Sequence, residues 1–347
     1  MKMMPRLLCC FVLLALAACG SPAPTSVPVQ IGTVPPVATQ VQAETNPAGA
    51  TQPPVGTPAA SYSAAARAYI QALTAIGPRI AGTDAEAQAA EYIADALNGM
   101  GYSAETKHFS GKDVSGNQLD SANVVAVKPG KSPRVIVVGA HYDSVAVGKG
   151  ADDNASGVAV LLEVADLLKN EATPYTIQFV AFGAEESGLV GSYAYVNQMT
   201  QADFENVVAM INMDSLIAGD VTYVYGDEQQ AALRDWTLEW AFGNGFDLQT
   251  IHNADLTDGH GMGVSDFSAF HAAGIPYIYF EATNWDLGAK DGYTQVDPKY
   301  GVNGEIWHTA DDTLEYLDAT FPGRVDQHLN LYVPVLYNIL TQYEAQP

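Results

Sequence analysis

The sequence predicts an α/β fold with a mixed, largely parallel central sheet and helices on both faces. Two observations support this. Segments rich in valine and isoleucine alternate along the chain with segments whose apolar residues recur at helical spacing. Some strand-like segments, such as "RVIVVGAHYD" (134–143), are apolar nearly throughout, which is typical of parallel strands buried on both faces. Ligands bind such sheets beyond the carboxyl ends of the strands, so polar residues there are functional candidates.

The expected elements follow one another from residue 63 onward. Residues 63–76 and 84–101 show helical spacing, and Gly101 suits the end of the second helix. A single domain over residues 61–347 is long enough to bury its own core. The further expected strands are 122–128, 134–143, 175–184, 206–214, 221–226 and 275–282, and the further expected helices are 156–170, 188–199, 228–243 and about 320–343.

The first sixty residues are expected to lie outside this domain. Residues 1–18 combine a basic start with an apolar run too short to span a bilayer, which predicts a signal peptide. The following "LAAC" resembles a bacterial lipobox, in which Cys19 becomes the lipidated first residue; the simpler interpretation is an ordinary cleavage site. Residues 19–60, rich in Pro and Thr, predict an extended linker. We therefore expect an exported lipoprotein at the cell surface or in the periplasm, held to the membrane only through Cys19.

Cysteine placement and charge restrict the chemistry further. All three cysteines (Cys9, Cys10 and Cys19) precede the domain, so it has no disulfide and no thiolate ligand or nucleophile. The formal net charge is −24, with 39 acidic residues against 15 basic ones. Nucleic acid and anionic membrane surfaces are poor partners for such a protein, whereas cations and cationic substrates suit it. The same charge would also simply keep an exported protein soluble.

Carboxylates and histidines follow the ends of the predicted strands. Each alone has an ordinary role, such as a surface histidine, a helix cap or a solvated glutamate. Together on one face they would repel one another unless a cation lay among them. This mixed nitrogen and oxygen set suits zinc, and it is large enough for two ions about 3.5–4 Å apart, bridged by a carboxylate and a water. The residues are His141, Asp143, Asp152, Asp153, Glu185, Glu186, Asp214 and His308.

Six motifs in this order resemble those of a known enzyme family. They are "GAHYDS", "GADDNASG", "AEESGLVGS", "NMDS", "SDFSAFHAAGIP" and "WHTADDT", spread over about residues 63–343. The pattern is similar to that of the co-catalytic di-zinc aminopeptidases of the secreted bacterial leucine-aminopeptidase type. Their wider group includes glutamate carboxypeptidases and glutaminyl cyclases. The resemblance implies a zinc-exopeptidase fold, a phosphorylase/hydrolase-like three-layer sandwich.

The resemblance also implies a ligand set. His141 and Glu186 match terminal ligands of different metals, and Asp153 matches the bridge between them. Asp214 would complete the site of His141, and His308 the site of Glu186. The family often has a cis peptide bond after the bridging aspartate. Manganese or cobalt could replace zinc at such ligands. With so many carboxylates in the chain, a separate structural calcium site also remains an open alternative.

The catalytic roles follow from the same resemblance. Glu185 matches the general base, which takes a proton from the metal-bridging water and delivers it to the leaving amine. Asp143 matches the carboxylate that orients His141. Asp152 has no ligand role in the family pattern, so we expect it to support its loop or to be exposed. We expect the remaining candidates not to bind metal: His252, His260, His271, Asp311 and Asp312.

The sequence constrains the substrate preference less than it constrains the metal ligands. Ser265 and Asp266 match a family element near the substrate pocket, and Met262 would line an apolar pocket, although an ordinary loop fits equally well. Relatives often carry a disulfide beside this loop, which is impossible here. An aminopeptidase is favoured over a carboxypeptidase because no arginine lies within a motif to capture a C-terminal carboxylate. We expect a monomeric enzyme that removes apolar residues from the N-termini of peptides.

Two alternatives to this function remain open. A glutaminyl cyclase of the same fold works with one catalytic zinc, and the complete set of five ligands argues against it. A non-catalytic lipoprotein that uses the fold for binding is expected to have lost ligands, and none is missing here.

Overall fold

The computed structural model describes residues 62–254, 256 and 264–345. At its centre lies a seven-stranded sheet with the order β1-β2-β4-β3-β5-β7-β6. The four inner strands β4, β3, β5 and β7 are parallel, which confirms the predicted mixed and largely parallel sheet, and the outer pairings are antiparallel. The strands are β1 (Glu105–Lys112), β2 (Gln118–Lys128), β3 (Ser132–His141), β4 (Tyr175–Phe182), β5 (Val207–Met213), β6 (Val221–Gly226) and β7 (Tyr277–Thr283).

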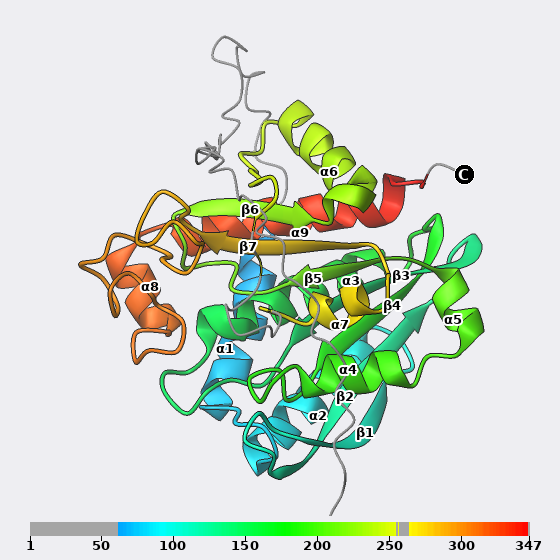
Figure 1. Ribbon diagram of the computed structural model, residues 1–347, viewed down its shortest axis with the longest axis horizontal. Helices are drawn as coiled ribbons and strands as arrows, with labels where there is room; N and C mark the ends of the chain where they lie inside the picture. The colour runs from blue at the N-terminus through cyan, green and yellow to red at the C-terminus, as the bar shows by residue number, and fades with distance from the viewer. Residues whose placement is uncertain (1–61, 255, 257–263, 346–347) are drawn as a thin grey trace, which may run out of the picture. The chain divides into compact units, whose positions relative to one another are not determined.

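Helices cover both faces of this sheet (Figure 1). One face packs against α1 (Ser63–Ile76), α2 (Asp84–Gly99), α3 (Gly157–Leu168), α6 (Ala232–Gly243), α8 (Leu314–Thr320) and α9 (Arg324–Gln342). The other face packs against α4 (Val190–Asn197), α5 (Gln201–Asn206) and α7 (Phe267–Ala272). Two short irregular turns, η1 (Ala151–Ser156) and η2 (Glu228–Gln230), connect elements. The expected arrangement of a sheet between two helical layers is therefore confirmed.

Successive residues of the inner strands enter opposite cores. In β3, Ile136 and Val138 pack into the core under α3, whereas Val137 packs into the core under α7. Gly139 follows on the second side, where a Cβ atom would lie 2.4 Å from the Phe182 ring and 2.6 Å from the Met210 methyl. This burial on both faces explains why the strand reads as a continuous apolar run.

One edge of the sheet, strand β1, was not predicted, whereas the opposite edge, β6, matches the expected strand 221–226. Strand β1 pairs only with β2, and most of its residues are polar and exposed, with Phe109 buried. An edge strand needs no apolar alternation, and polar side chains protect it from pairing with other chains. For the same reason β2 begins at Gln118, before the apolar segment that predicted it.

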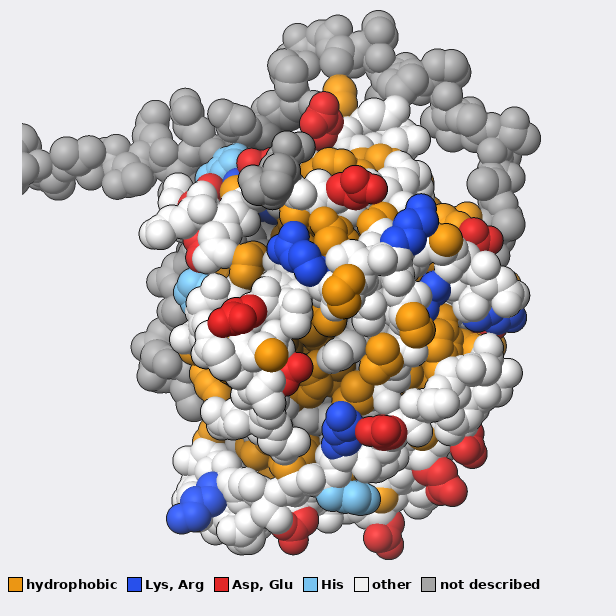
Figure 2. Space-filling view, turned by 90° about the vertical axis from the view of Figure 1, so that its right-hand side faces the viewer, with side chains coloured by type: hydrophobic (Ala, Val, Ile, Leu, Met, Phe, Trp, Pro, Cys, Tyr) orange, Lys and Arg blue, Asp and Glu red, His pale blue; other side chains and the backbone are white. Residues whose placement is uncertain are grey.

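Charge is unevenly distributed over the surface. Figure 2 shows the face that lies on the right-hand side of Figure 1, where α5 is placed. Lysine and arginine side chains lie there among aspartates and glutamates, with apolar side chains between them. The strongly negative net charge therefore does not make every face acidic.

The predicted signal peptide, Cys19 and the linker lie outside the described residues, so the domain boundaries remain predictions. Within the described part of the chain, no helix is both long and apolar enough to cross a membrane.

Candidate metal centre

The predicted site residues converge at the carboxyl ends of the parallel strands. His141 ends β3, the Glu185 and Glu186 pair follows β4, and Asp214 follows β5. Two loops complete the group: η1 contributes Asp153, and the loop before α8 contributes His308. Residues from five separate segments thus meet at the edge where parallel α/β sheets bind ligands.

Asp153 lies between the two histidines. Its Oδ1 is 3.1 Å from His141 Nε2, and its Oδ2 is 3.1 Å from His308 Nε2. His141 Nε2 also lies 3.3 Å from Asp214 Oδ1, and His308 Nε2 lies 2.9 Å from Glu186 Oε2. The peptide bond after Asp153 is cis, as the family resemblance implied. The side chains therefore form two adjoining donor groups that share one carboxylate.

Distance alone does not separate the two glutamates. One compact group of candidate ligand atoms contains His141, Asp153 and Glu186, and a second contains His141, Glu185 and Asp214. Both glutamates are close enough to a common point to hold an ion. A division of roles between them must therefore come from chemistry rather than from proximity.

The donor set fits zinc. Imidazole nitrogens and carboxylate oxygens are ligands that Zn²⁺ accepts without cysteine. Glu186 Oε1 is buried and has no hydrogen-bond partner among the described residues. Leaving a buried acceptor unsatisfied costs about 1–3 kcal/mol, more when it is charged. A bound cation would satisfy this oxygen, so the residues present suit the metal that the family pattern implies.

The pKa values of the charged side chains in the cluster also indicate that it suits a bound cation. Burial raises the pKa of Glu185 well above its ordinary value. Burial, together with repulsion from Asp153, raises the pKa of Glu186 to about 7. Hydrogen bonds with Asp153 and Glu186 raise the pKa of His308 to about 11. The cluster carries more negative charge than its protein surroundings neutralise, and protons or divalent cations compensate for it.

Asp143 holds the backbone of the glutamate pair. Its Oδ1 accepts the N–H of Glu185 at 3.0 Å, and its Oδ2 accepts the N–H of Glu186 at 3.1 Å. Asp143 Oδ1 also lies 3.5 Å from His141 Nδ1, which is longer than a good hydrogen bond. This fully buried carboxylate therefore sits beside His141, but its short contacts position both glutamates.

Asp152 is buried and supports the neighbouring loops. Its Oδ1 accepts the backbone N–H groups of Ile217 and Ala218 at 2.7 and 3.0 Å. Its Oδ2 accepts a hydrogen bond from Gln295 Nε2 at 2.6 Å. Of the two placements expected for Asp152, the loop-supporting one is therefore found, and exposure is wrong because the side chain is fully buried.

Gln295 and Asp312 extend this network to the remaining ligand loops. Gln295 Oε1 accepts the N–H groups of Ile306 and Trp307, at 2.8 and 3.0 Å, just before His308. Asp312 accepts the N–H groups of Asp152 at 2.6 Å and of Asp153 at 3.2 Å. The loops carrying Asp153, Asp214 and His308 are thus tied together by three buried side chains. Gln295 has no signature in the sequence, because a neutral amide in a loop matches no metal-site pattern.

Arg79 is a second supporting residue that the sequence does not reveal. Its guanidinium is fully buried and donates to the carbonyl oxygens of Tyr142, Lys149 and Gly150 at 2.7, 2.7 and 2.9 Å. Gly150 has a φ of 59°, and a Cβ atom there would lie 2.7 Å from this guanidinium. Arg79 therefore braces both ends of the loop that joins β3 to η1, between His141 and Asp153, and it places one buried positive charge near the carboxylates.

The residues expected near substrate are placed differently. Ser265 is fully buried, donates to Asp214 Oδ2 at 2.7 Å and accepts from Asn212 Nδ2 at 2.8 Å. Asp266 is also fully buried, and burial raises its pKa to about 7. Neither lines the cavity at the site, so their contact with substrate stays a prediction. Met262 lies outside the described residues.

The spare histidines lie apart from the two donor groups. His252 and His271 are exposed and approach Glu228 and Asp227, at 3.2 and 3.7 Å. His260 lies outside the described residues. No other cluster of three or more candidate ligands occurs in the described part of the chain, so the calcium site stays a prediction without a location.

A cavity of about 490 Å³ opens beside the two donor groups. Its floor includes His141, Asp153 and Glu185. The walls come from residues within the ranges 279–293 and 305–308, and from Gly188 and Leu189 just before α4. The site is therefore accessible to a ligand large enough to fill a pocket rather than to an ion alone.

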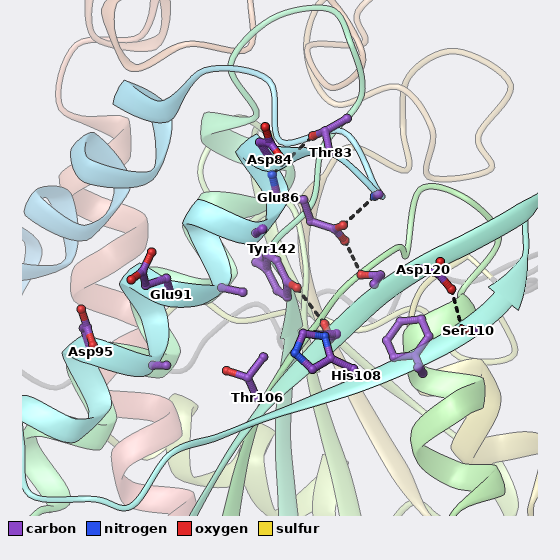
Figure 3. Close-up of a pocket in the computed structure, with 17 residues that line it drawn as sticks. Thr83, Asp84, Glu86, Glu91, Asp95, Thr106, His108, Ser110, Asp120 and Tyr142 are labelled. Carbon is purple, nitrogen blue, oxygen red and sulfur yellow. Dashed lines mark hydrogen bonds between the residues drawn. The ribbon is translucent and has the colours of Figure 1, made fainter.

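A larger cavity of about 780 Å³ is separate from this site. It lies between α2 and the β1–β2 pair, and it contains none of the predicted site residues (Figure 3). Glu86 in its wall accepts hydrogen bonds from Gly82 N and Ser121 Oγ, both at 2.6 Å, and from Ala184 N at 3.1 Å. Glu86 thus holds the backbone N–H of Ala184, the residue immediately before Glu185.

Comparison with known proteins agrees with this geometry. Residues 123–333 match the model of Peptidase family M28. The chain is 32% identical over 280 residues to the alkaline phosphatase isozyme conversion protein of Escherichia coli K12, covering 72% of this chain and 81% of that one. It is 32% identical over 244 residues to aminopeptidase YwaD of Bacillus subtilis 168, covering 65% and 46%. It is 30% identical over 228 residues to the probable lipoprotein aminopeptidase LpqL of Mycobacterium tuberculosis H37Rv, covering 60% and 44%.

Solved structures share the fold at lower identity. The zinc aminopeptidase BSAP from Bacillus subtilis superposes with a TM-score of 0.66 and 21% identity, over 84% of this chain and 98% of that one. The glutaminyl cyclase of Tannerella forsythia superposes with a TM-score of 0.63 and 21% identity, over 81% and 99%. The match to the family model covers more than half of the chain, and the relative from Escherichia coli is matched over most of its length. The chain is therefore a hydrolase that belongs to peptidase family M28.

Proposed function

We propose that this protein is a zinc-dependent aminopeptidase that removes N-terminal residues from peptides. The observation that carries the proposal is the pair of adjoining donor groups sharing Asp153 at the floor of an open cavity. Relatives named as aminopeptidases support it. The substrate is a peptide whose first residue enters the cavity beside the metal centre.

The metal ions are assigned to the residues in the way that the family pattern implies. His141 and Asp214 would hold one ion, Glu186 and His308 would hold the other, and Asp153 would be shared between them. When bound, the ions act as Lewis acids that polarise the scissile carbonyl and lower the pKa of water from 15.7 towards about 7. The contacts of His141 with Asp153 and Asp214, and of His308 with Asp153 and Glu186, match this assignment.

Glu185 is the general base in this proposal. Its side chain lines the cavity, so it can take a proton from the attacking water and give it to the leaving amine. Asp143 and Glu86 fix the backbone on either side of it, through the N–H groups of Glu185, Glu186 and Ala184. Asp143 acts as a positioning residue for the base and for His141.

The charge of the cavity favours an N-terminal over a C-terminal substrate group. Its described lining contains Glu281, Asp291 and Glu305 in addition to the metal centre, and it contains no lysine or arginine. A free ammonium group is attracted to such a lining, whereas a free carboxylate is repelled. This supports an aminopeptidase rather than a carboxypeptidase.

The placement of the enzyme follows from its first sixty residues. We propose that residues 1–18 are a lipoprotein signal peptide, that Cys19 carries the lipid, and that residues 19–60 link it to the catalytic domain 61–347. The relative LpqL is named as a lipoprotein aminopeptidase, which supports this arrangement. The enzyme would then act outside the cytoplasm as a monomer.

A glutaminyl cyclase is the second candidate. The similarity of the solved cyclase structure, at 21% identity, concerns the fold alone. The presence of all five donors, arranged as two adjoining groups, favours the two-metal peptidase.

The proposed function is tested with aminoacyl p-nitroanilides and their N-acetylated counterparts. The full-length protein with two equivalents of zinc is expected to cleave the free-amino substrates and to leave the acetylated ones intact. A chelator is expected to abolish cleavage, and added zinc to restore it, because the donors alone cannot activate water. Equal cleavage of acetylated substrates would contradict an aminopeptidase. Cyclisation of an N-terminal glutamine peptide by a protein holding one zinc would favour the second candidate.

A further inference from the structure

The larger of the two cavities forms a groove between α2 and the β1–β2 hairpin (Figure 3). On the helix side it is lined by Ala87, Ala90 and Ala94, which recur at helical spacing and leave open the space that larger side chains would fill. Phe109 and Tyr142 supply a buried apolar floor. Its volume of about 780 Å³ lies in the range of pockets that bind ligands.

The rim of this groove is acidic. Five carboxylates line it, His108 is its one histidine among the described residues, and neither lysine of β1 faces it. None of the five forms an ion pair with a basic side chain in the described part of the chain. Glu91 and Asp95 are exposed on the helix side, and Thr106 and His108 lie on the strand side (Figure 3). The groove therefore suits a ligand that carries several positive charges. The carboxylates are those of Asp84, Glu86, Glu91, Asp95 and Asp120.

The strand side of the groove is also the edge of the sheet. Strand β1 pairs with β2 and with no other strand of the described residues, so its outer edge carries backbone N–H and C=O groups without a strand partner. Alternate residues of β1 line the groove, namely Thr106, His108 and Ser110. An extended peptide that adds to such an edge gains backbone hydrogen bonds, and every second side chain of it points to the same side. Edge and groove thus fit one ligand, an extended segment whose alternate side chains are basic.

Both sides of the groove are connected to the backbone beside the catalytic glutamates. From α2, Glu86 accepts the N–H of Ala184 at 3.1 Å, and Ala184 is held at a φ of 57°. From the tip of the β1–β2 hairpin, the N–H of Val114 donates to the carbonyl oxygen of Ser187 at 3.0 Å. The glutamate pair lies between Ala184 and Ser187, so a displacement of either side of the groove is transmitted to it.

We propose that this groove is an effector site: it binds an extended peptide segment with basic side chains along the free edge of β1 and thereby raises kcat at the metal centre. The binding is independent of the proposed aminopeptidase function, whereas the effect on kcat rests on it. A segment that contacts α2 and β1 together restrains both sides of the groove. A bound ligand shifts a protein towards the arrangement to which it binds better, here the one with both backbone contacts formed. The glutamate pair then stays in its reactive placement for a larger fraction of the time.

Binding is measured by fluorescence anisotropy on the full-length, zinc-loaded protein. The probe is an octapeptide in which lysine alternates with valine, labelled at its C-terminus and acetylated at its N-terminus so that it is no substrate for an aminopeptidase. The double variant Glu91→Gln with Asp95→Asn is expected to weaken binding at least about threefold at low salt, because each exposed charge pair contributes modestly. A probe N-methylated at alternate residues cannot pair fully with a strand edge and should bind at least about tenfold more weakly.

A matched control removes two exposed charges elsewhere. Glu205→Gln with Glu239→Gln changes the net charge by the same amount on α5 and α6, and neither residue lines the groove. This control should keep the wild-type affinity for the probe. An equal loss of affinity in the control would replace the groove by general attraction to the net charge of −24 and overturn the site.

The effect on the rate is measured with leucine p-nitroanilide. Saturating peptide is expected to raise kcat about fivefold, the lower end of the usual coupling between two sites. The peptide concentration that gives half of this rise should equal the Kd from anisotropy and should increase with it in Glu91→Gln with Asp95→Asn. Leucine hydroxamate, which chelates metal at the catalytic centre, should leave the peptide bound.

Four other results would overturn the inference in different ways. A peptide that only competes with the substrate, or that leucine hydroxamate displaces, would bind in the catalytic cavity and not at a separate site. Equal binding of the N-methylated probe would rule out pairing with β1. Binding in the groove with an unchanged kcat would rule out the effector role. Failure of the zinc-loaded protein to cleave any free-amino substrate would overturn the proposed function and the effector role with it, while anisotropy would still decide whether the groove binds the peptide.

Discussion

Glu185→Gln is expected to keep both metal ions and to lose about 10²–10⁴-fold in kcat, the usual contribution of a general base. Glu186→Gln is expected to lose metal as well as activity, because a neutral amide is a poor substitute for a terminal carboxylate ligand. The two residues are adjacent, are both partly enclosed, and both have their backbone N–H held by Asp143. The two variants therefore differ in side-chain role rather than in local fold.

The measurement is zinc content per chain, alongside kcat and KM for a free-amino substrate. Because Glu185 lies in one compact group with His141 and Asp214, proximity alone would allow it to be a ligand. Loss of zinc from Glu185→Gln equal to that from Glu186→Gln would contradict the proposed division. Circular dichroism of both variants with and without zinc shows whether a lost metal reflects a missing ligand or a misfolded chain.

The sequence was sufficient to predict the inner sheet and the candidate ligands because both carry strong local signals. Buried parallel strands read as apolar runs, and His141, Glu186 and Asp214 stand directly at or after their ends. Strand β1 has no such signal, since its residues face solvent and its pairing depends on β2 alone. Local pattern predicts what packs against a core, and it fails where only backbone hydrogen bonds define the element.

The residues that support the site were harder to predict for a related reason. Arg79 and Gln295 act on backbone groups far away in the sequence, and a backbone N–H or carbonyl leaves no trace in residue type. Even the adjacent Asp152 and Asp153 look equivalent in "GADDN". Only the fold shows that Asp152 turns towards Ile217 and Gln295 while Asp153 turns towards the histidines.

The Asp152–Gln295 contact predicts a rescue experiment on the supporting network. Asp152→Asn can still accept the N–H groups of Ile217 and Ala218, but its amide then faces the Gln295 amide, donor against donor. We expect the variant to lose about 1–3 kcal/mol of unfolding free energy. We also expect metal affinity about 10–100-fold lower, because the loop before His308 depends on Gln295.

The swapped pair Asp152→Asn with Gln295→Glu restores every hydrogen bond in this contact. One oxygen of the new carboxylate at 295 accepts from the amide at 152, and the other keeps the N–H groups of Ile306 and Trp307. Gln295→Glu alone places two carboxylates together and should be at least as damaging as Asp152→Asn. Thermal unfolding and zinc titration of the four proteins form a double-mutant cycle, in which the double variant should recover most of both losses. Additive losses in the double variant would show that the contact does not couple the loops. Recovery of stability without recovery of zinc affinity would mean that the network supports the fold but not the positions of the ligands.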